Sequence, residues 1–271
     1  MEHGTPSTLL DEAVGSIAGC LLLLHDSVET TAAFLLHHFL KRSLSPHSSN
    51  AVIFVSFAHP FSHYDRILRK LGCNLAAQRD NNRFFFFDML KWECPGEEFR
   101  RIFSFLMEQI YDSSDEAEEA KRRSALVTLF GKIQKVIGAL PQERRSSVTI
   151  MIDDISLMEV AARGSMNLVI DFLHYCHTLT SELGCSLVAL NHEDIYSSTK
   201  RPTLVLQLEY LARILIKAEP LTTGLAKDVH GQLTVLNRGT YDGAESKYRV
   251  HNFHFKVKEN CVEYFIPGSR T

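Results

Sequence analysis

The spacing of hydrophobic residues changes abruptly near the start of the chain. Leu21 to Leu24 form an unbroken apolar run of strand length. A buried strand that leads into an amphipathic helix is the usual beginning of a phosphate-binding α/β domain. The apolar residues that follow the run, at the spacing of one helical face, are Ala32, Leu35, Leu36, Phe39 and Leu40.

The link between this strand and this helix lacks the residues that hold phosphate. Such links read G-x-x-x-x-G-K-[ST], with glycines for close backbone approach and a lysine for positive charge. Here the link, Asp26 to Thr31, is shorter and has no glycine or lysine. Asp26 and Glu29 have capping-box spacing, so both carboxylates are expected at the helix N-terminus. We interpret Asp26, Glu29 and Thr30 as a phosphate position filled by the chain's own acids; the alternative is a well-capped helix of an unrelated α/β protein.

Apolar strands alternate with helices up to about residue 195. We expect strands at 51–58, 83–89, 148–152 and 185–190, and one intervening helix between Phe99 and Ile110. Short strands follow, and Lys258 to Cys261 join the last two in a hairpin pattern. This order predicts a mainly parallel β-sheet with helices on both faces and an antiparallel C-terminal extension. We assign residues 16–271 to this domain and residues 1–15 to a flexible lead-in with a short helix near Leu9–Val14.

Two acids follow the strand at 148–152. An apolar strand that ends in an acid is where a nucleotide triphosphatase holds Mg²⁺. Asp153 and Asp154 therefore occupy a Walker-B-like position. Without the glycines and the lysine, a metal here would lack half of its ligands, so these acids mark the position and do not establish an activity. An NTPase with a degenerate P-loop that uses Asp153 and Asp154 is the alternative.

Composition limits the classes of function. The 271 residues are 45% hydrophobic, the formal charge is -3 and the pI is near 6.5, so any RNA contact must come from a local patch or a partner. The six cysteines contain no CxxC pair, which favours reduced thiols in an intracellular protein. No apolar run reaches the ~20 residues of a membrane span, and the N-terminus has no basic signal region. We expect a cytoplasmic and nuclear protein.

The remaining motifs offer no catalytic, cofactor or metal site. The histidine pairs at His59 and His63 and at His174 and His177 have no second half of a zinc ligand set, so packing roles are favoured. G-x-S-x-G and G-x-G-x-x-G motifs are absent. We expect no catalytic residue, no cofactor and no metal.

One basic pair differs from the others. Lys200 and Arg201 follow the strand at 185–190 through a long loop, and Arg163 follows the strand at 148–152. In ring-forming RecA-type domains the loops after these strands point into the central channel and touch nucleic acid. By this analogy the three residues are candidates for RNA contact; solvated surface charge is the alternative.

Three segments resemble a known family, that of Elongator complex subunit 6, most closely its plant members. They read PFSHYDRILRKLGCNLA at 60–76, DFLHYCHTLTSE at 171–182 and DVHGQLTVLN at 228–237. The resemblance implies a RecA-type domain without ATPase motifs that joins subunits 4 and 5 in a hetero-hexameric ring. It also implies that the ring binds tRNA and supports wobble-uridine (U34) modification, whose chemistry belongs to another Elongator subunit.

Overall fold

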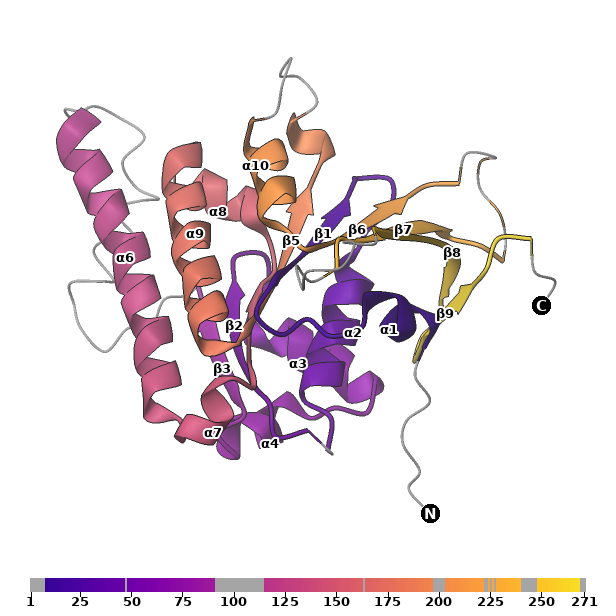
Figure 1. Cartoon of the computed structure of the whole chain (residues 1–271), viewed down its shortest axis with the longest axis horizontal. Coiled ribbons are helices and arrows are strands. Elements are labelled where there is room, and N and C mark those ends of the chain that lie inside the picture. The colour runs from indigo at the N-terminus through magenta and orange to yellow at the C-terminus, as the bar shows by residue number, and fades with distance from the viewer. Residues whose placement is uncertain are drawn as a thin grey trace.

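The computed structural model describes residues 8–46, 48–90, 115–162, 164–196, 203–221, 224, 226, 228–239 and 248–268. For residues 115–125, 196 and 203 only the backbone is described. Figure 1 shows a twisted sheet between two groups of helices. The helix expected between Phe99 and Ile110 lies outside the described residues, as do Arg163, Lys200 and Arg201.

The described strands form one nine-stranded sheet, in the order β3-β2-β4-β5-β1-β6-β7-β8-β9. The six strands from β3 to β6 are parallel, and β6 to β9 pair antiparallel. This confirms the predicted sheet and its C-terminal extension. The strands are β1 (Leu21–Asp26), β2 (Ala51–Ser56), β3 (Phe84–Asp88), β4 (Val148–Ile152), β5 (Ser186–His192), β6 (Ile214–Glu219), β7 (Gly231–Asn237), β8 (Arg249–Val257) and β9 (Val262–Phe265).

Helices cover both faces of the parallel part of the sheet. One face packs against α1 (Leu9–Val14), α2 (Ala33–Ser43), α3 (Phe61–Lys70) and α4 (Leu75–Asp80). The other packs against α6 (Asp115–Ala139), α8 (Ile155–Ala161), α9 (Met166–Leu183) and α10 (Thr203–Leu211), while α7 (Gln142–Arg145) is a short turn before β4. Every residue of β1, β2 and β4 is buried, which explains their continuous apolar sequences.

The start of α3 differs from the simplest reading of the sequence. Ser62 is a common type of capping residue, but α3 begins at Phe61, before this serine, and its N-cap is Pro60. Proline suits this position because it has no N–H group to leave unpaired. Gly72 follows α3 with φ of 86°, the left-handed conformation expected for a helix stop.

The lead-in that we expected to be flexible contributes to the core from residue 9 onward. Leu10, Ala13 and Val14 of α1 are buried against the sheet. Asp11 joins this helix to α2 through contacts of 3.0 Å with His38 Nε2 and Arg42 Nη1. Burial alone would raise the pKa of Asp11, but His38 and Arg42 hold it below the usual range. The short helix near Leu9–Val14 is therefore confirmed.

The described helices include none with the combination of length and apolar composition needed to cross a membrane.

The backbone of the antiparallel extension packs closely around Gly231, so we predict that Gly231→Ala destabilises the fold. A Cβ atom at Gly231 would lie 2.7 Å from the carbonyl oxygen of Glu219 and 2.8 Å from the ring of Phe255. We expect this overpacking to lower the free energy of unfolding by about 1–3 kcal/mol in urea titrations.

Gly131→Ala, inside α6, is the matched control. Nothing lies within 4 Å of a Cβ atom at Gly131. This change should raise the free energy of unfolding by roughly 0.5–1 kcal/mol because alanine favours the helix. Equal effects of the two substitutions would contradict the close packing at Gly231.

Candidate functional site

Polar side chains gather where three neighbouring parallel strands end. Asp26 is the last residue of β1, Asp153 and Asp154 follow β4, and His192 is the last residue of β5. The strands β4, β5 and β1 are neighbours in the sheet, so their carboxyl ends meet at one edge. This edge is where open α/β sheets usually bind ligands.

The link after β1 forms a tight turn and then enters α2. Thr30 N donates to Ser27 O at 3.1 Å, and these two residues form an isolated antiparallel bridge. The predicted capping box is wrong: α2 begins only at Ala33, so Glu29 precedes the first helical turn, and its side chain is exposed. Because of this turn, Glu29 and its neighbours lie before α2. A strand that led directly into the helix would have placed them in the first helical turn.

Asp26 nevertheless supplies an acid at the start of α2. Its Oδ2 accepts a hydrogen bond of 2.7 Å from Ala32 N, the N-cap residue. The carboxylate of Asp194, in the loop after β5, accepts one of 2.7 Å from Val28 N. Thr31 Oγ1 accepts another, of 3.1 Å, from Ala33 N. A phosphate-binding loop needs free backbone N–H groups, and here those of Val28, Thr30, Ala32 and Ala33 are bonded to protein oxygens.

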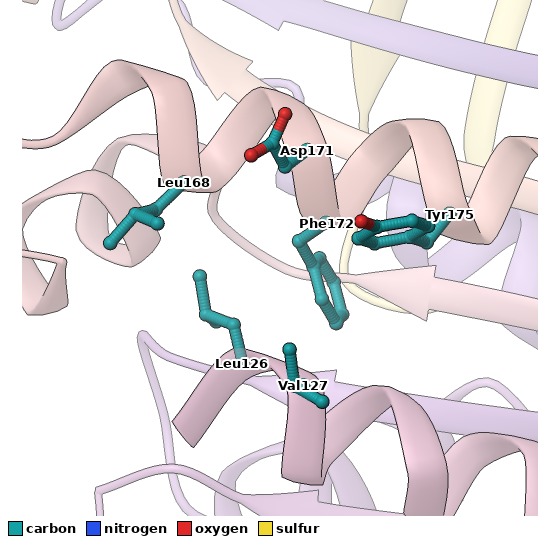
Figure 2. A pocket seen from close by; sticks show the side chains of 6 residues that line it. All are labelled: Leu126, Val127, Leu168, Asp171, Phe172 and Tyr175. Atoms are coloured by element: carbon teal, nitrogen blue, oxygen red, sulfur yellow. The ribbon is translucent and has the colours of Figure 1, made fainter. Parts of the chain in front are cut away.

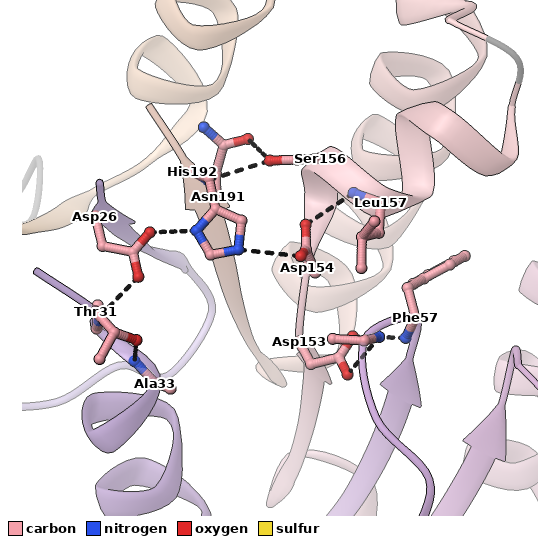
Figure 3. Close-up of polar contacts among 12 residues, drawn as sticks. Asp26, Thr31, Ala33, Phe57, Asp153, Asp154, Ser156, Leu157, Asn191 and His192 are labelled. Atoms are coloured by element: carbon pink, nitrogen blue, oxygen red, sulfur yellow. Dashed lines mark hydrogen bonds and ion pairs between the residues drawn. The ribbon is translucent and has the colours of Figure 1, made fainter. Parts of the chain in front are cut away.

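His192 bridges two of the acids. Its Nδ1 makes a short contact with Asp26 Oδ1, and its Nε2 lies 3.1 Å from Asp154 Oδ2 (Figure 3). The contacts with Asp154 and Asp26 raise the pKa of His192 to about 10, against the effect of partial burial. At neutral pH the ring is therefore an imidazolium that donates from both nitrogens. No sequence motif singles out His192; the available signal is that it follows the apolar run at 185–190.

Asp154 and a neighbouring serine fix this histidine from the α8 side. Asp154 is the N-cap of α8, and its Oδ1 accepts a 2.8 Å hydrogen bond from Leu157 N. Ser156 Oγ accepts one of 3.2 Å from the backbone N–H of His192. Both carboxylate oxygens of Asp154 are thus bonded within the chain.

Asp153 faces the opposite way, toward β2 and α3. Its carboxylate accepts hydrogen bonds from Tyr64 Oη at 2.6 Å and from Ser56 Oγ at 2.5 Å. It also accepts from the backbone N–H groups of Phe57, at 2.6 Å, and Ala58, at 3.0 Å. Burial raises the pKa of Asp153, and these hydrogen bonds oppose that increase. The side chain is 2% exposed and anchors the β2–α3 connection.

The residues at this edge do not fit a magnesium–nucleotide group. Asp153 accepts four hydrogen bonds, each oxygen of Asp154 has a partner within the chain, and four amides of the link are bonded to protein oxygens. Within the bridge of Asp26, His192 and Asp154 the formal charges sum to -1, so a triphosphate would meet repulsion. The arrangement can join strands, but it cannot supply the metal ligands and phosphate cradle of a P-loop.

A small, mostly apolar pocket lies away from this edge. It lies between α6 and α9 and has a volume of about 80 Å³ (Figure 2). Sites for drug-sized ligands typically have about 300–1,000 Å³, so this hollow cannot enclose a nucleotide. Its lining residues are Leu126, Val127, Leu168, Asp171, Phe172 and Tyr175.

The other histidines singled out from sequence make packing contacts. The rings of His59 and His63 stack with centroids 4.0 Å apart, beside the buried Tyr64. Burial and the neighbouring His63 lower the pKa of His37, on α2, to about 4. Five cysteines are described as free thiols, of which four are buried.

A family model described as "Elongation complex protein 6" matches residues 8–259. A protein named Elongator complex protein 6 from Mus musculus is 30% identical over 259 residues, with 92% of this chain and 91% of that protein covered. Its namesake from Xenopus laevis is 28% identical over 258 residues with the same coverage. The Dictyostelium discoideum protein of that name is 25% identical over 327 residues, with 96% and 94% covered.

A solved structure resembles the fold over nearly the whole chain. It is the crystal structure of a KaiC-like protein from the hyperthermophilic archaeon Pyrococcus horikoshii OT3, with a TM-score of 0.63 and 14% sequence identity. The match covers 95% of this chain and 96% of the archaeal chain. The predicted RecA-like fold is confirmed.

The protonated bridge predicts a particular dependence of stability on pH. The unfolded chain releases the His192 proton near the ordinary pKa of 6.5, whereas the folded chain keeps it to about 10. The stabilisation is therefore complete below pH 6.5 and is lost as the pH rises through the folded pKa. We expect the free energy of unfolding to fall between about pH 7 and pH 10 in urea titrations.

His192→Gln removes the titrating group, so its profile should be flatter than that of the wild type over this range. Because the His192 side chain is 32% exposed, we expect a loss of about 2–4 kcal/mol at neutral pH, near the lower end of the cost of breaking a buried ion pair. His174→Gln, on the exposed side of α9, should keep the wild-type profile. The same pH slope in His192→Gln and wild type would rule out the protonated bridge.

Proposed function

The chain belongs to the Elongation complex protein 6 family, and we propose that it is a non-catalytic, RecA-like subunit of the Elongator complex. The observation that carries the proposal is the internal pairing at the nucleotide edge. Asp26, His192 and Asp154 bond one another where a nucleotide and its metal would need free groups. The protein therefore acts through assembly, as a pseudo-ATPase.

We propose that it joins Elongator subunits 4 and 5 in a hetero-hexameric ring in the cytoplasm and nucleus. The ring binds tRNA and supports wobble-uridine modification, while the chemistry is carried out elsewhere in the complex. The RecA-like fold supports this, because RecA-type domains commonly work as ring subunits, and the family match supports membership of the complex. Contacts with tRNA would be made mainly to the negatively charged phosphate backbone of the RNA and less to its bases.

The rival function, an NTPase that uses Asp153 and Asp154, has less support. A metal at Asp153 would have to displace donors from Ser56 and Tyr64 and from two backbone amides. A metal at Asp154 would have to displace the His192 imidazolium. Each displacement leaves buried polar groups unpaired, which opposes binding.

Calorimetry with Mg-ATP tests the proposal directly. We predict no measurable heat of binding up to about 1 mM nucleotide, because the link has no lysine and both acids are already bonded within the chain. An ATPase with an intact P-loop serves as the positive control in the same buffer. Micromolar binding together with turnover would overturn the assembly function in favour of the enzyme.

The predicted RNA contacts are tested on the ring reconstituted with subunits 4 and 5. Lys200→Ser with Arg201→Ser should weaken tRNA binding and reduce the salt slope of log K by roughly 1–2, since each phosphate contact releases about one counterion. Arg66→Ser with Arg69→Ser, on α3, is the charge-matched control and should leave the slope unchanged. Equal slopes for the two double variants would remove Lys200 and Arg201 from the interface.

A further inference from the structure

A second charged cluster lies across the sheet from the histidine bridge. Consecutive residues of a strand point to opposite faces, so His25 and Asp26 at the end of β1 face different sides. His25 faces Glu193, which follows β5, and Glu209, which belongs to α10. Lys217 of β6 is the register partner of His25 and completes the group.

His25 is the unusual member of this cluster. Its side chain is fully buried, and neither ring nitrogen has a hydrogen-bond partner. The nearest carboxylate oxygen, Glu193 Oε2, lies 3.7 Å from Nδ1, which is beyond hydrogen-bond length. A buried polar group left unpaired costs free energy, so the ring is poised for a ligand that can use its lone pair.

The spacing of the three side chains suits a small metal ion. One ligand atom each from His25, Glu193 and Glu209 lie within 4.8 Å of one another. Zinc bonds of about 2.0–2.1 Å in a tetrahedron place ligand atoms about 3.3 Å apart. Side-chain rotation of the two glutamates can close this difference, because the Glu193 side chain is 43% exposed and that of Glu209 is 23% exposed.

Lys217 supplies the positive charge that faces the two glutamates of this cluster. Its Nζ lies 3.1 Å from Glu193 Oε1 and 2.9 Å from Glu209 Oε1. The ammonium group donates to the two carboxylates, and neither ring nitrogen of His25 has a hydrogen bond from it. A divalent ion would satisfy all three side chains and would neutralise both carboxylates.

We propose that His25, Glu193 and Glu209 form a binding site for a divalent transition metal, for which Zn²⁺ is the probe, and that the metal displaces the Lys217 ammonium. An imidazole nitrogen with two carboxylates favours zinc-like ions over Mg²⁺, which prefers oxygen ligands. Three protein ligands leave the fourth position to water on the exposed side of Glu193. The bound ion would join the ends of β1 and β5 to α10.

Zinc titration calorimetry on three forms of the chain tests the site. Lys217→Met removes the competing cation, and we expect it to bind one Zn²⁺ at least about tenfold more tightly than the wild type. Adding Glu209→Gln to Lys217→Met should reverse this gain by about tenfold or more. Glu209 is partly exposed on α10, so this variant avoids the folding risk of replacing the buried His25.

The stacked pair His59 and His63 could also chelate zinc and supplies the matched control. His59→Ala with His63→Ala, in the Lys217→Met background, should leave the zinc affinity unchanged. Zinc should also raise the melting temperature of Lys217→Met but not that of Lys217→Met with Glu209→Gln. Affinity that survives Glu209→Gln, or that is lost with the His59 and His63 changes, would overturn the proposal, as would the absence of stoichiometric binding to Lys217→Met.

Discussion

One imidazolium ring sets the arrangement of the nucleotide edge. Asp26 and Asp154 project from two strands that flank β5, and two buried carboxylates this close would repel each other. His192, on the strand between them, donates one N–H group to each acid. Removing the histidine would leave two neighbouring buried carboxylates without compensation, so both acids depend on the strand between them. This constraint explains why the acids are tolerated in the interior of the domain.

The same constraint accounts for a RecA-like fold that persists without the usual ligand contacts. Buried backbone and side-chain groups must find partners, and in a nucleotide-binding protein the phosphate and its metal provide many of them. In this chain Asp26 and Asp194 bond the loop amides, and Ser56 and Tyr64 bond Asp153. These contacts are made within the chain, and they support the proposed role as an assembly subunit.

The sequence predicted the elements better than their side-chain partners. The strand at Val148–Ile152 was placed at its observed bounds, because a continuous apolar run reports burial directly. The capping box failed because Asp26 ends a strand, and a turn intervenes before α2. The bridge could not be predicted, since Asp26 and His192 are 166 residues apart and only the strand order makes them neighbours. Helix α8 is short, with seven residues, and gives no periodic signal.

The two residues that end β1 show how the sheet separates two electrostatic environments. Asp26 has a partner for each carboxylate oxygen, whereas His25, its neighbour in sequence, has none for either nitrogen. Because both carboxylate oxygens of Asp26 are bonded within the chain, an acid with internal partners occupies the position where related folds bind phosphate. On the His25 side, Glu193 Oε2 lies 3.7 Å from the ring and the Lys217 ammonium lies between Glu193 and Glu209, where the proposed ion would take its place. A residue left unpaired beside an exchangeable cation is thus the point at which this edge of the sheet can still accept a ligand.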